Sequence, residues 1–327
     1  MDIIYRIFSG RIRKVLQNLK LNLNQLQEIR LRVNGPLLLL YNNTEYMIDQ
    51  NGYLTSFTNN PYRIIASDME ETIGYISNYS LYAYEDEIRQ GFLTIHGGHR
   101  VGLAGKVIVD NGKIRNLQYI TFMNIRISHQ IKNCASEILP YLITNNKIQH
   151  TLLISPPGCG KTTMLRDLVR LLSNGDSVLN GQNVGVVDER SEIGACYQGV
   201  PQNDLGIRTD ILDCCPKSEG MMMLVRSMSP QVIAVDEIGG REDIAALEYV
   251  MNSGCQVIAT IHGHSVEEVK QKSAMCKLIE EKAFQRYVVL DNKVRIGTVS
   301  QIFDAQGNIL YGRNRTKKEL PYHSCIT

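Results

Sequence analysis

The 327-residue sequence has no apolar run that approaches the roughly 18 residues needed for a membrane-spanning helix. The run Pro36–Tyr41 is far too short, and the first 20 residues mix charges among their apolar positions and lack a signal-peptide core. The eight cysteines form no C-x-x-C pair and no zinc-ligand spacing. These absences argue against a disulfide framework and a zinc site, and they favour free thiols in a reducing cytosol.

The sequence also lacks a strong excess of either charge. Lys and Arg total 35 against 33 Asp and Glu, a net charge of +2, which argues against a surface devoted to nucleic-acid phosphates. Charged residues make up 21% and hydrophobic residues 43% of the chain, so it is neither disordered nor built like a membrane channel. The length suits two domains with ample cores. We therefore expect a soluble, two-domain globular protein.

The first 128 residues have the pattern of an α+β domain. A helical opening leads to two short apolar runs, 36–41 and 45–49, which predict a hairpin. Ser67-Asp-Met-Glu70 has the spacing of a capping box and predicts a helix that runs toward residue 76. Strands are expected at 92–96, 101–109 and 114–121, the last two joined by a turn at 110–112. A connecting helix is expected within residues 129–149.

From residue 150 onward, strands and helices alternate, which predicts a parallel sheet with crossover helices. The expected strands are 151–154, 183–188, 231–235 and 256–260, and the expected helices are 161–172, 218–228, 241–253 and 265–272. Residues 232–235 and 257–259 are apolar without period-two gaps, so their strands should be central. The chain then returns to hairpin-like strands around 286–290, 294–299 and 309–311.

A glycine-containing loop, Ser155 to Thr163, follows a short apolar strand and opens an amphipathic helix, which is the context that a phosphate-binding loop requires. Its glycines let backbone N–H groups face a polyphosphate, Lys161 supplies a charge for the β- and γ-phosphates, and Thr162 supplies a hydroxyl for Mg²⁺. Ser155 departs from the pattern, which has a glycine there. The expected nucleotide-binding residues are Pro157, Gly158, Cys159, Gly160, Lys161, Thr162 and Thr163. Cys159 is better explained as a tolerated small residue than as a redox switch.

Asp236 and Glu237 follow the predicted central strand 232–235, at the edge where open α/β sheets bind ligands. Asp236 would hold Mg²⁺ through water, and Glu237 would orient or deprotonate the attacking water. An apolar strand that ends in Asp-Glu could also merely cap the next helix. The phosphate-binding loop upstream favours the catalytic interpretation.

Two further strand ends should reach the same edge of the sheet. After strand 183–188, Glu189 could polarise water or contact a neighbouring subunit, although Asp188–Glu192 could equally be a solvated charge cluster. After strand 256–260, His262 or Thr260 could sense the γ-phosphate, whereas His264 better fits the start of a helix capped by Ser265. The methionines 221–223 are better explained as core filling.

Six segments together resemble the stage III sporulation protein AA family, ATPases of endospore-forming bacteria. They are Glu28–Arg32, Gly97–Gly105, Thr151–Thr163, Val187–Ile193, Met228–Gly239 and Ala259–Gly263. The family is similar in turn to the secretion ATPases of type II and type IV systems, which form hexameric rings on the cytoplasmic face of membrane machines. Their four motifs map onto Lys161 and Thr162, Asp188 and Glu189, Asp236 and Glu237, and His262. Those enzymes commonly carry Gly-Glu where this chain has Asp236-Glu237, which leaves the metal site closer to a general RecA-like ATPase.

The resemblance implies an α/β fold: a RecA-like P-loop NTPase domain with a mainly parallel sheet over residues 129–327, after an α+β domain over 1–128. It implies hydrolysis of ATP with Mg²⁺ by a homo-oligomer, with a hexameric ring as the expected form. The expected catalytic residues are Glu237, Glu189, His262, Arg100 and Arg126, of which the two arginines are candidates to complete a neighbouring subunit's site. The expected metal ligands are Thr162 and Asp236. Arg226 would act within its own chain.

The same resemblance implies that ATP hydrolysis energises a membrane-associated channel complex during endospore formation. We expect a cytoplasmic protein held at the membrane by channel proteins, without direct insertion and without nucleic acid. The basic residues Arg313, Arg315, Lys317 and Lys318 should bind anionic lipid only weakly. One alternative is a nucleic-acid motor of the same fold, against which the near-neutral charge stands. Another is a nucleotide-dependent scaffold without turnover, against which Glu237 stands.

Overall fold

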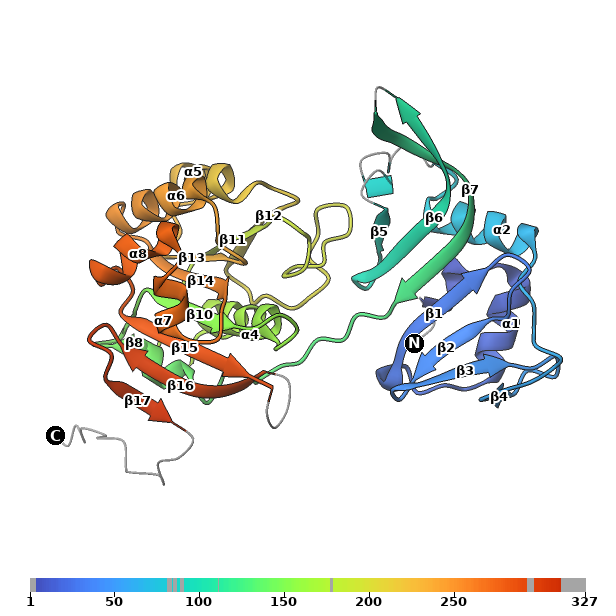
Figure 1. The fold of residues 1–327 in the computed structure, drawn as a ribbon, viewed down its shortest axis with the longest axis horizontal. Coiled ribbons are helices and arrows are strands. Elements are labelled where there is room, and N and C mark those ends of the chain that lie inside the picture. Colours follow the sequence, from blue (N-terminus) through green and yellow to red (C-terminus); the bar gives the residue numbers. More distant parts are fainter. Residues whose placement is uncertain are drawn as a thin grey trace. The chain divides into compact units, whose positions relative to one another are not determined.

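The computed structural model describes residues 4–80, 84, 87–88, 91–110, 112–176, 179–292 and 297–312. The chain divides into two compact units, drawn in Figure 1. Unit 1 comprises Met1–His129 and Ala195–Asn203, and unit 2 comprises Gln130–Gly194 and Asp204–Thr327.

Unit 1 is built on an antiparallel sheet, on which α1 (Gly10–Asn18) and α2 (Ala66–Ile76) pack. The sheet has the order β4-β3-β2-β1-β7-β6-β5. Its strands are β1 (Leu26–Arg32), β2 (Leu38–Tyr41), β3 (Thr44–Ile48), β4 (Leu54–Thr55), β5 (Phe92–Ile95), β6 (His99–Asp110) and β7 (Lys113–Arg126). Its described helical elements include the 3₁₀ turns Ile4–Ile7 and Leu23–Gln25 together with α1 and α2. Ile12 of α1 and Met69 of α2 share one buried core with Ile29 of β1, so the helices cover the apolar face of the sheet.

The predicted hairpin and the three later strands of unit 1 are confirmed. β2 pairs antiparallel with β3, and β6 pairs with both β5 and β7. The predicted capping box at Ser67 is wrong, because α2 begins at Ala66 with Ile65 in the N-cap position. The Asp68 carboxylate accepts the Ile65 N–H at 3.1 Å and also binds the Ser9 hydroxyl and Arg11, both at 2.8 Å. These distant partners fix where the helix begins.

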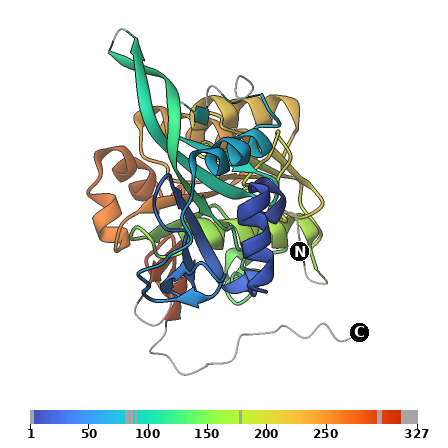
Figure 2. The same ribbon diagram turned by 90° about the vertical axis from the view of Figure 1, so that its right-hand side faces the viewer.

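The β6–β7 ribbon extends beyond its neighbouring strands, as Figures 1 and 2 show. β5 pairs with β6 only as far as Gly102, and β1 pairs with β7 only as far as Phe122, whereas the β6–β7 ladder continues to Asp110. Val109 and Ile114 near the end of the ribbon are 60% and 53% exposed. The turn predicted at 110–112 includes Asn111, which lies outside the described residues.

Residues 195–203 pack within unit 1 although they lie between β-strands of unit 2 in the sequence. Gln202 accepts the N–H of Gly97 at 2.8 Å, and the ring of Tyr197 lies edge-on to His96 at 6.1 Å. Gly98 has a φ of +73°, and a Cβ there would lie 3.0 Å from Cβ of Ala195. The backbone conformation and the close approach both require glycine at this position.

Unit 2 is an α/β fold around a mainly parallel sheet of order β12-β11-β13-β14-β10-β15-β16-β17, as predicted. Its strands are β10 (Thr151–Ser155), β11 (Val184–Asp188), β12 (Thr209–Asp213), β13 (Val232–Val235), β14 (Gln256–His262), β15 (Arg286–Asp291), β16 (Thr298–Asp304) and β17 (Ile309–Gly312). Its α-helices are α4 (Lys161–Asn174), α5 (Lys217–Ser227), α6 (Arg241–Asn252), α7 (Val266–Lys270) and α8 (Ser273–Glu280). β13 and β14 are central, which confirms the prediction from their unbroken apolar runs.

Two separate cores fill the two faces of this sheet. α4 packs on one face, where Leu165 and Leu168 meet Leu153 of β10. α5, α6 and α8 pack on the other face with Leu152 of β10, so successive residues of one buried strand serve opposite cores. Figure 1 shows the same three layers. Of the methionines predicted to fill the core, Met221 is buried but Met223 is 55% exposed.

The connecting helix predicted within residues 129–149 is wrong. The segment contains only a 3₁₀ turn, Leu139–Leu142, and the short strands β8 (Ile143–Thr144) and β9 (Lys147–Ile148) among its described elements. Pro140 lies in the 3₁₀ turn, and Asn145 and Asn146 take positive φ angles that end any helix.

Several sequence expectations concern the end of the chain or its relation to membranes. β16 (Thr298–Asp304) contains the end of the predicted strand 294–299. Residues 294–296 of that prediction lie outside the described residues. The basic residues from Arg313 to Lys318 also lie outside them. Within the described ranges, no helix combines the length and apolarity required to cross a bilayer.

Candidate functional site

The phosphate-binding loop predicted from the sequence joins the buried strand β10 to α4. Gly158 and Gly160 have φ angles of +71° and +80°, a conformation that glycine adopts without strain. A Cβ built on Gly158 would meet no atom within 4 Å, so the loop leaves open space there. Cys159 turns its side chain inward and is 1% exposed. The loop therefore presents backbone at the N-terminus of α4, where the helix dipole favours an anion.

Asp236 and Glu237 reach this loop from the end of β13, and Thr260 of β14 ties them together. Asp236 Oδ2 accepts a hydrogen bond from Thr162 Oγ1 at 2.6 Å, and its other oxygen accepts one from the Thr260 hydroxyl. The Thr260 oxygen in turn accepts the N–H of Glu237 at 2.8 Å. Glu237 has a φ of +54°, which is unusual outside glycine. These contacts hold its backbone in that conformation.

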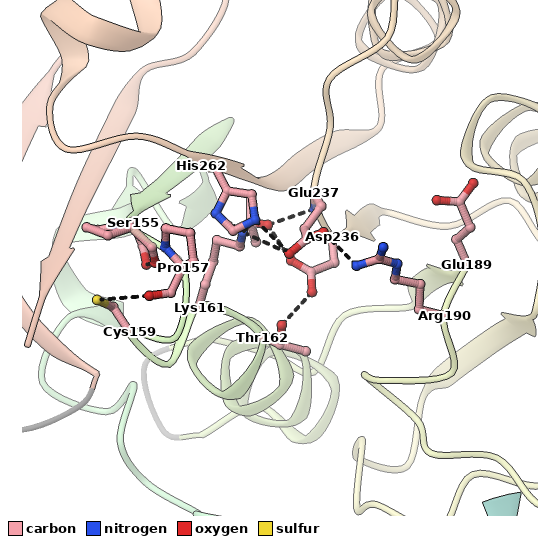
Figure 3. Close-up of polar contacts among 12 residues, drawn as sticks. Ser155, Pro157, Cys159, Lys161, Thr162, Glu189, Arg190, Asp236, Glu237 and His262 are labelled. Carbon is pink, nitrogen blue, oxygen red and sulfur yellow. Dashed lines mark hydrogen bonds and ion pairs between the residues drawn. The ribbon is translucent and has the colours of Figure 1, made fainter. Parts of the chain in front are cut away.

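The Glu237 carboxylate lies among three basic side chains, drawn in Figure 3. Its Oε1 is 3.3 Å from Lys161 Nζ and 3.0 Å from His262 Nε2, and its Oε2 is 3.3 Å from a guanidinium nitrogen of Arg190. Partial burial opposes ionisation of this carboxyl, but the neighbouring basic groups of Lys161, His262 and Arg190 outweigh it and lower its pKa. Glu237 is therefore ionised at neutral pH and available to accept a proton.

Asp188, at the end of β11, is 2% exposed and anchors the segment that follows it. Its carboxylate accepts the backbone N–H groups of Glu192, Ile193 and Gly194 at 2.8 to 2.9 Å. Burial raises the pKa of Asp188 to about 6, against the opposing effect of these hydrogen bonds. On the carbonyl side of the segment, Arg166 of α4 donates to Ile193 O at 2.8 Å and to Glu192 O. Residues 192–194 are thus held through both their N–H groups and their carbonyl groups.

A pocket brings together the carboxyl ends of β11 and β13. Its lining residues are Asp188, Glu189, Arg190, Glu192, Lys217, Asp236 and Glu237. Glu189 forms an ion pair with Lys217 at this pocket and does not join the charge cluster around Glu237. Arg226 lies exposed on α5 beside Glu219 and Met223 and does not line this pocket, and its expected action within its own chain stays a prediction.

The two other arginines expected at the site lie in unit 1. Arg100 of β6 and Arg126 of β7 are opposite each other in the β6–β7 ladder. The Arg100 guanidinium lies 4.2 Å from the centre of the Phe92 ring, and Arg126 Nε is 3.8 Å from Glu28 Oε1. Their predicted part in a neighbouring subunit's site stays a prediction.

Sequence reasoning missed Arg166, Arg190 and Lys217 as members of this site. Arg190 stands inside the acidic segment that the sequence singled out, so its position was a usable signal. Arg166 gave none, because its carbonyl partners are 26 and 27 residues further along the chain.

The oxygen groups beside the loop fit a magnesium nucleotide. Mg²⁺ prefers hard oxygen ligands and commonly binds through one or two protein groups together with phosphate oxygens. The Thr162 hydroxyl and the Asp236 carboxylate lie side by side at the first turn of α4. Lys161, 5% exposed, adds a positive charge directly behind the loop. The arrangement thus combines groups that suit a polyphosphate, oxygen atoms that suit a metal ion, and an ionised carboxylate that can act as a base.

Solved ATPase structures share this fold. The pilus retraction motor PilT with bound ADP aligns with a TM-score of 0.54 and 11% identity over 85% of this chain and 76% of that chain. The ATPase DotB of Legionella pneumophila aligns with a TM-score of 0.52 and 16% identity over 85% of this chain and 75% of that chain. At these identities the likeness shows the fold alone.

Relationship at the sequence level is much closer. The stage III sporulation protein AA of Bacillus subtilis is 45% identical over 286 residues, which are 88% of this chain and 89% of that protein. The family model described as sporulation stage III, protein AA matches residues 1–310. The resemblance carried by the sequence motifs is thereby confirmed: the chain belongs to the stage III sporulation protein AA family.

Proposed function

We propose that this protein is a P-loop ATPase that energises a membrane-associated channel complex during endospore formation. The observation that carries the ATPase proposal is the meeting of the phosphate-binding loop with Asp236 and Glu237 at one sheet edge. The ADP bound to PilT, which shares the fold, supports nucleotide binding. Membership of the sporulation family supports the setting, and the channel is proposed by analogy with secretion ATPases.

The residues around the loop divide the work of binding and hydrolysis. Backbone groups of residues 157–160 and the start of α4 bind phosphate, together with Lys161, Thr162 and Thr163. Thr162 and Asp236 hold Mg²⁺, which when bound neutralises phosphate charge. Glu237 orients the attacking water and accepts its proton, because it is the ionised carboxylate beside Lys161.

His262 and Glu189 have supporting parts in this proposal. His262 lies 3.0 Å from Glu237 Oε1 and would report the presence of the γ-phosphate to the base. Glu189 lines the neighbouring pocket, where its carboxylate would polarise water or contact another subunit.

The active form proposed is a homo-oligomer, with a hexameric ring as its expected form. An arginine supplied in trans stabilises the charge of the transition state and can change the rate by orders of magnitude. Arg100 and Arg126 are the candidates. Mixing Glu237→Gln subunits, whose arginines are intact, with Arg100→Ala or Arg126→Ala subunits should restore some activity. Absence of recovery in every mixture would argue for a site complete within one chain.

The proposed location is the cytoplasmic face of the membrane, reached through channel proteins and without direct insertion. Purified protein should float poorly with anionic liposomes at physiological salt, yet co-fractionate with membranes in cells that contain the channel proteins. Strong, salt-resistant binding of the isolated protein to liposomes would contradict this attachment through partners.

A steady-state assay of ATP hydrolysis, run together with size measurement with and without nucleotide, tests the central proposal. The expected result is Mg²⁺-dependent hydrolysis and a nucleotide-dependent increase in size. Nucleotide binding and assembly without hydrolysis would instead support a scaffold, and no nucleotide binding at all would refute the ATPase proposal.

A further inference from the structure

Arg190 occupies a place that the roles above leave unused. Its backbone lies in the segment 189–194, whose flanking groups are fixed by Asp188 and Arg166. Its side chain is 67% exposed and reaches Glu237 Oε2 at 3.3 Å, whereas Lys161 and His262 contact the other oxygen, Oε1. Figure 3 shows Arg190 and Lys161 approaching the carboxylate from different sides. Glu237 is thus held between two cations from different elements.

The charges around the pocket make Arg190 the cation suited to an incoming anion. Five of the seven residues that line the pocket are carboxylates, and the other two are Arg190 and Lys217. Lys217 is 14% exposed and is paired with Glu189, whereas Arg190, which contacts Glu237, is 67% exposed. A bound triphosphate places several negative charges near these carboxylates. A cation on this side of the site would reduce the resulting electrostatic repulsion.

A guanidinium binds phosphate more effectively than it binds a single carboxylate oxygen at 3.3 Å. Its planar fork of N–H groups matches two phosphate oxygens at once, and charge-assisted bonds of this kind are among the strongest in proteins. Because the backbone on either side is anchored, the side chain can exchange partners by rotation alone while the segment stays in place.

We propose that Arg190 binds the γ-phosphate of a nucleoside triphosphate and leaves Glu237 when it does so. Lys161 moves to the phosphates in the same event, so that two of the three basic side chains that contact Glu237 are withdrawn together. Glu237 Oε2, which Arg190 contacts in this structure, is then released toward the attacking water when a triphosphate is bound. This inference rests on the proposed ATPase function and adds to it a residue that distinguishes triphosphate from diphosphate.

Binding and turnover by Arg190→Ala and Arg190→Lys test the assignment. The affinity for a non-hydrolysable ATP analogue should fall about tenfold in Arg190→Ala, with the affinity for ADP unchanged. The turnover number kcat should fall about a hundredfold, since the lost charge stabilises the transition state. Arg190→Lys should recover part of the analogue affinity but little of kcat, because an ammonium lacks the planar fork. Lys277→Ala, which removes a surface lysine paired with Glu248, is the matched control and should change none of these values.

Each other outcome counts against the inference in a recognisable way. Equal loss of affinity for ADP and for the analogue, accompanied by a lower melting temperature, would make Arg190 a structural residue of its segment. If the wild-type protein hydrolyses ATP and the Arg190 variants keep its kcat and its affinities, the inference is refuted while the ATPase proposal stands. Failure of the wild-type protein itself to bind ATP would refute both.

Discussion

β11 and β13 are neighbouring parallel strands, and each leads into a Val-Asp-Glu sequence, yet the two acidic pairs make different contacts. Val187 and Val235 are in register, so the two Asp-Glu pairs leave the sheet side by side. The Asp236 carboxylate accepts hydrogen bonds from hydroxyl groups on α4 and β14. The Asp188 carboxylate instead accepts hydrogen bonds from backbone N–H groups of the segment that follows it. The same dipeptide lies beside the phosphate-binding loop at one strand, where we propose a metal site, and fixes loop structure at the next.

The two glutamates differ in the same way. Glu237 contacts Lys161, His262 and Arg190, whereas Glu189 pairs with Lys217 of α5 and is 41% exposed. The sheet order explains the contrast, because β14 alone separates β13 from β10, the strand that leads into the phosphate-binding loop, and β11 lies one strand further out. An acidic pair at a strand end therefore acquires its role from the distance of that strand to the loop.

The largest effects are expected for Glu237, the proposed base, and for Lys161, the proposed phosphate-binding residue. Glu237→Gln should lower kcat between about a hundredfold and ten-thousandfold and retain nucleotide affinity, because only the proton acceptor is lost. Lys161→Ala should abolish tight nucleotide binding, because it acts on phosphates in the ground state. Isothermal titration and single-turnover hydrolysis measure the two quantities. Equal loss of binding in both variants would contradict these roles.

Because Asp188 is buried, the free energy of unfolding should depend on pH in the range where this carboxyl titrates. Its pKa is about 6 in the folded protein and about 4 in the unfolded chain, so the folded state binds the proton more tightly. The stability that this group contributes is complete below about pH 4 and is lost as the pH rises through about 6.

Asp188→Asn removes that titration and provides the measurement. Between pH 4 and pH 7, the free energy of unfolding of the wild type should fall relative to Asp188→Asn by at most about 3 kcal/mol. Urea denaturation at a series of pH values gives this difference. A constant difference across the range would mean that Asp188 is not proton-linked to folding.

Thr260→Val tests the hydroxyl that ties Asp236 to Glu237. The variant keeps the shape of the side chain but leaves the Glu237 N–H without its acceptor and removes the donor to Asp236 Oδ1, while Thr162 still donates to Oδ2. We expect kcat to fall about tenfold and stability to fall by about 1 to 2 kcal/mol. Thr260→Ser, which restores the hydroxyl, should return most of the activity. If Thr260→Ser were as impaired as Thr260→Val, packing would be the cause.

The smallest effect is expected at the β11 end. Glu189→Gln should lower kcat only severalfold, because its carboxylate is already paired with Lys217 away from the Glu237 cluster. Lys217→Met should have a similar effect, and the double variant should be no worse than either single one. A loss in Glu189→Gln as large as that in Glu237→Gln would show that Glu189 acts directly on water.

Patterns within one stretch of chain predicted most of the fold and the centre of the site. Apolar runs gave the central strands β13 and β14, and the loop before α4 gave Lys161 and Thr162, since these signals are local. The start of α2 could not be predicted, because Ser9 and Arg11 fix it from more than 50 residues away. The role of Arg166 could not be predicted either, because its partners are 26 and 27 residues away in the sequence. Contacts between distant segments decide what a local pattern leaves open.

The packing of residues 195–203 in unit 1 means that neither unit is a continuous piece of the chain. The backbone crosses from one unit to the other after His129, after Gly194 and after Asn203. A gene fragment that ended at residue 129 would encode unit 1 without Gln202 and Tyr197, the partners of Gly97 and His96. Domain shuffling by simple fusion would separate these residues, so we expect the two units to be inherited together.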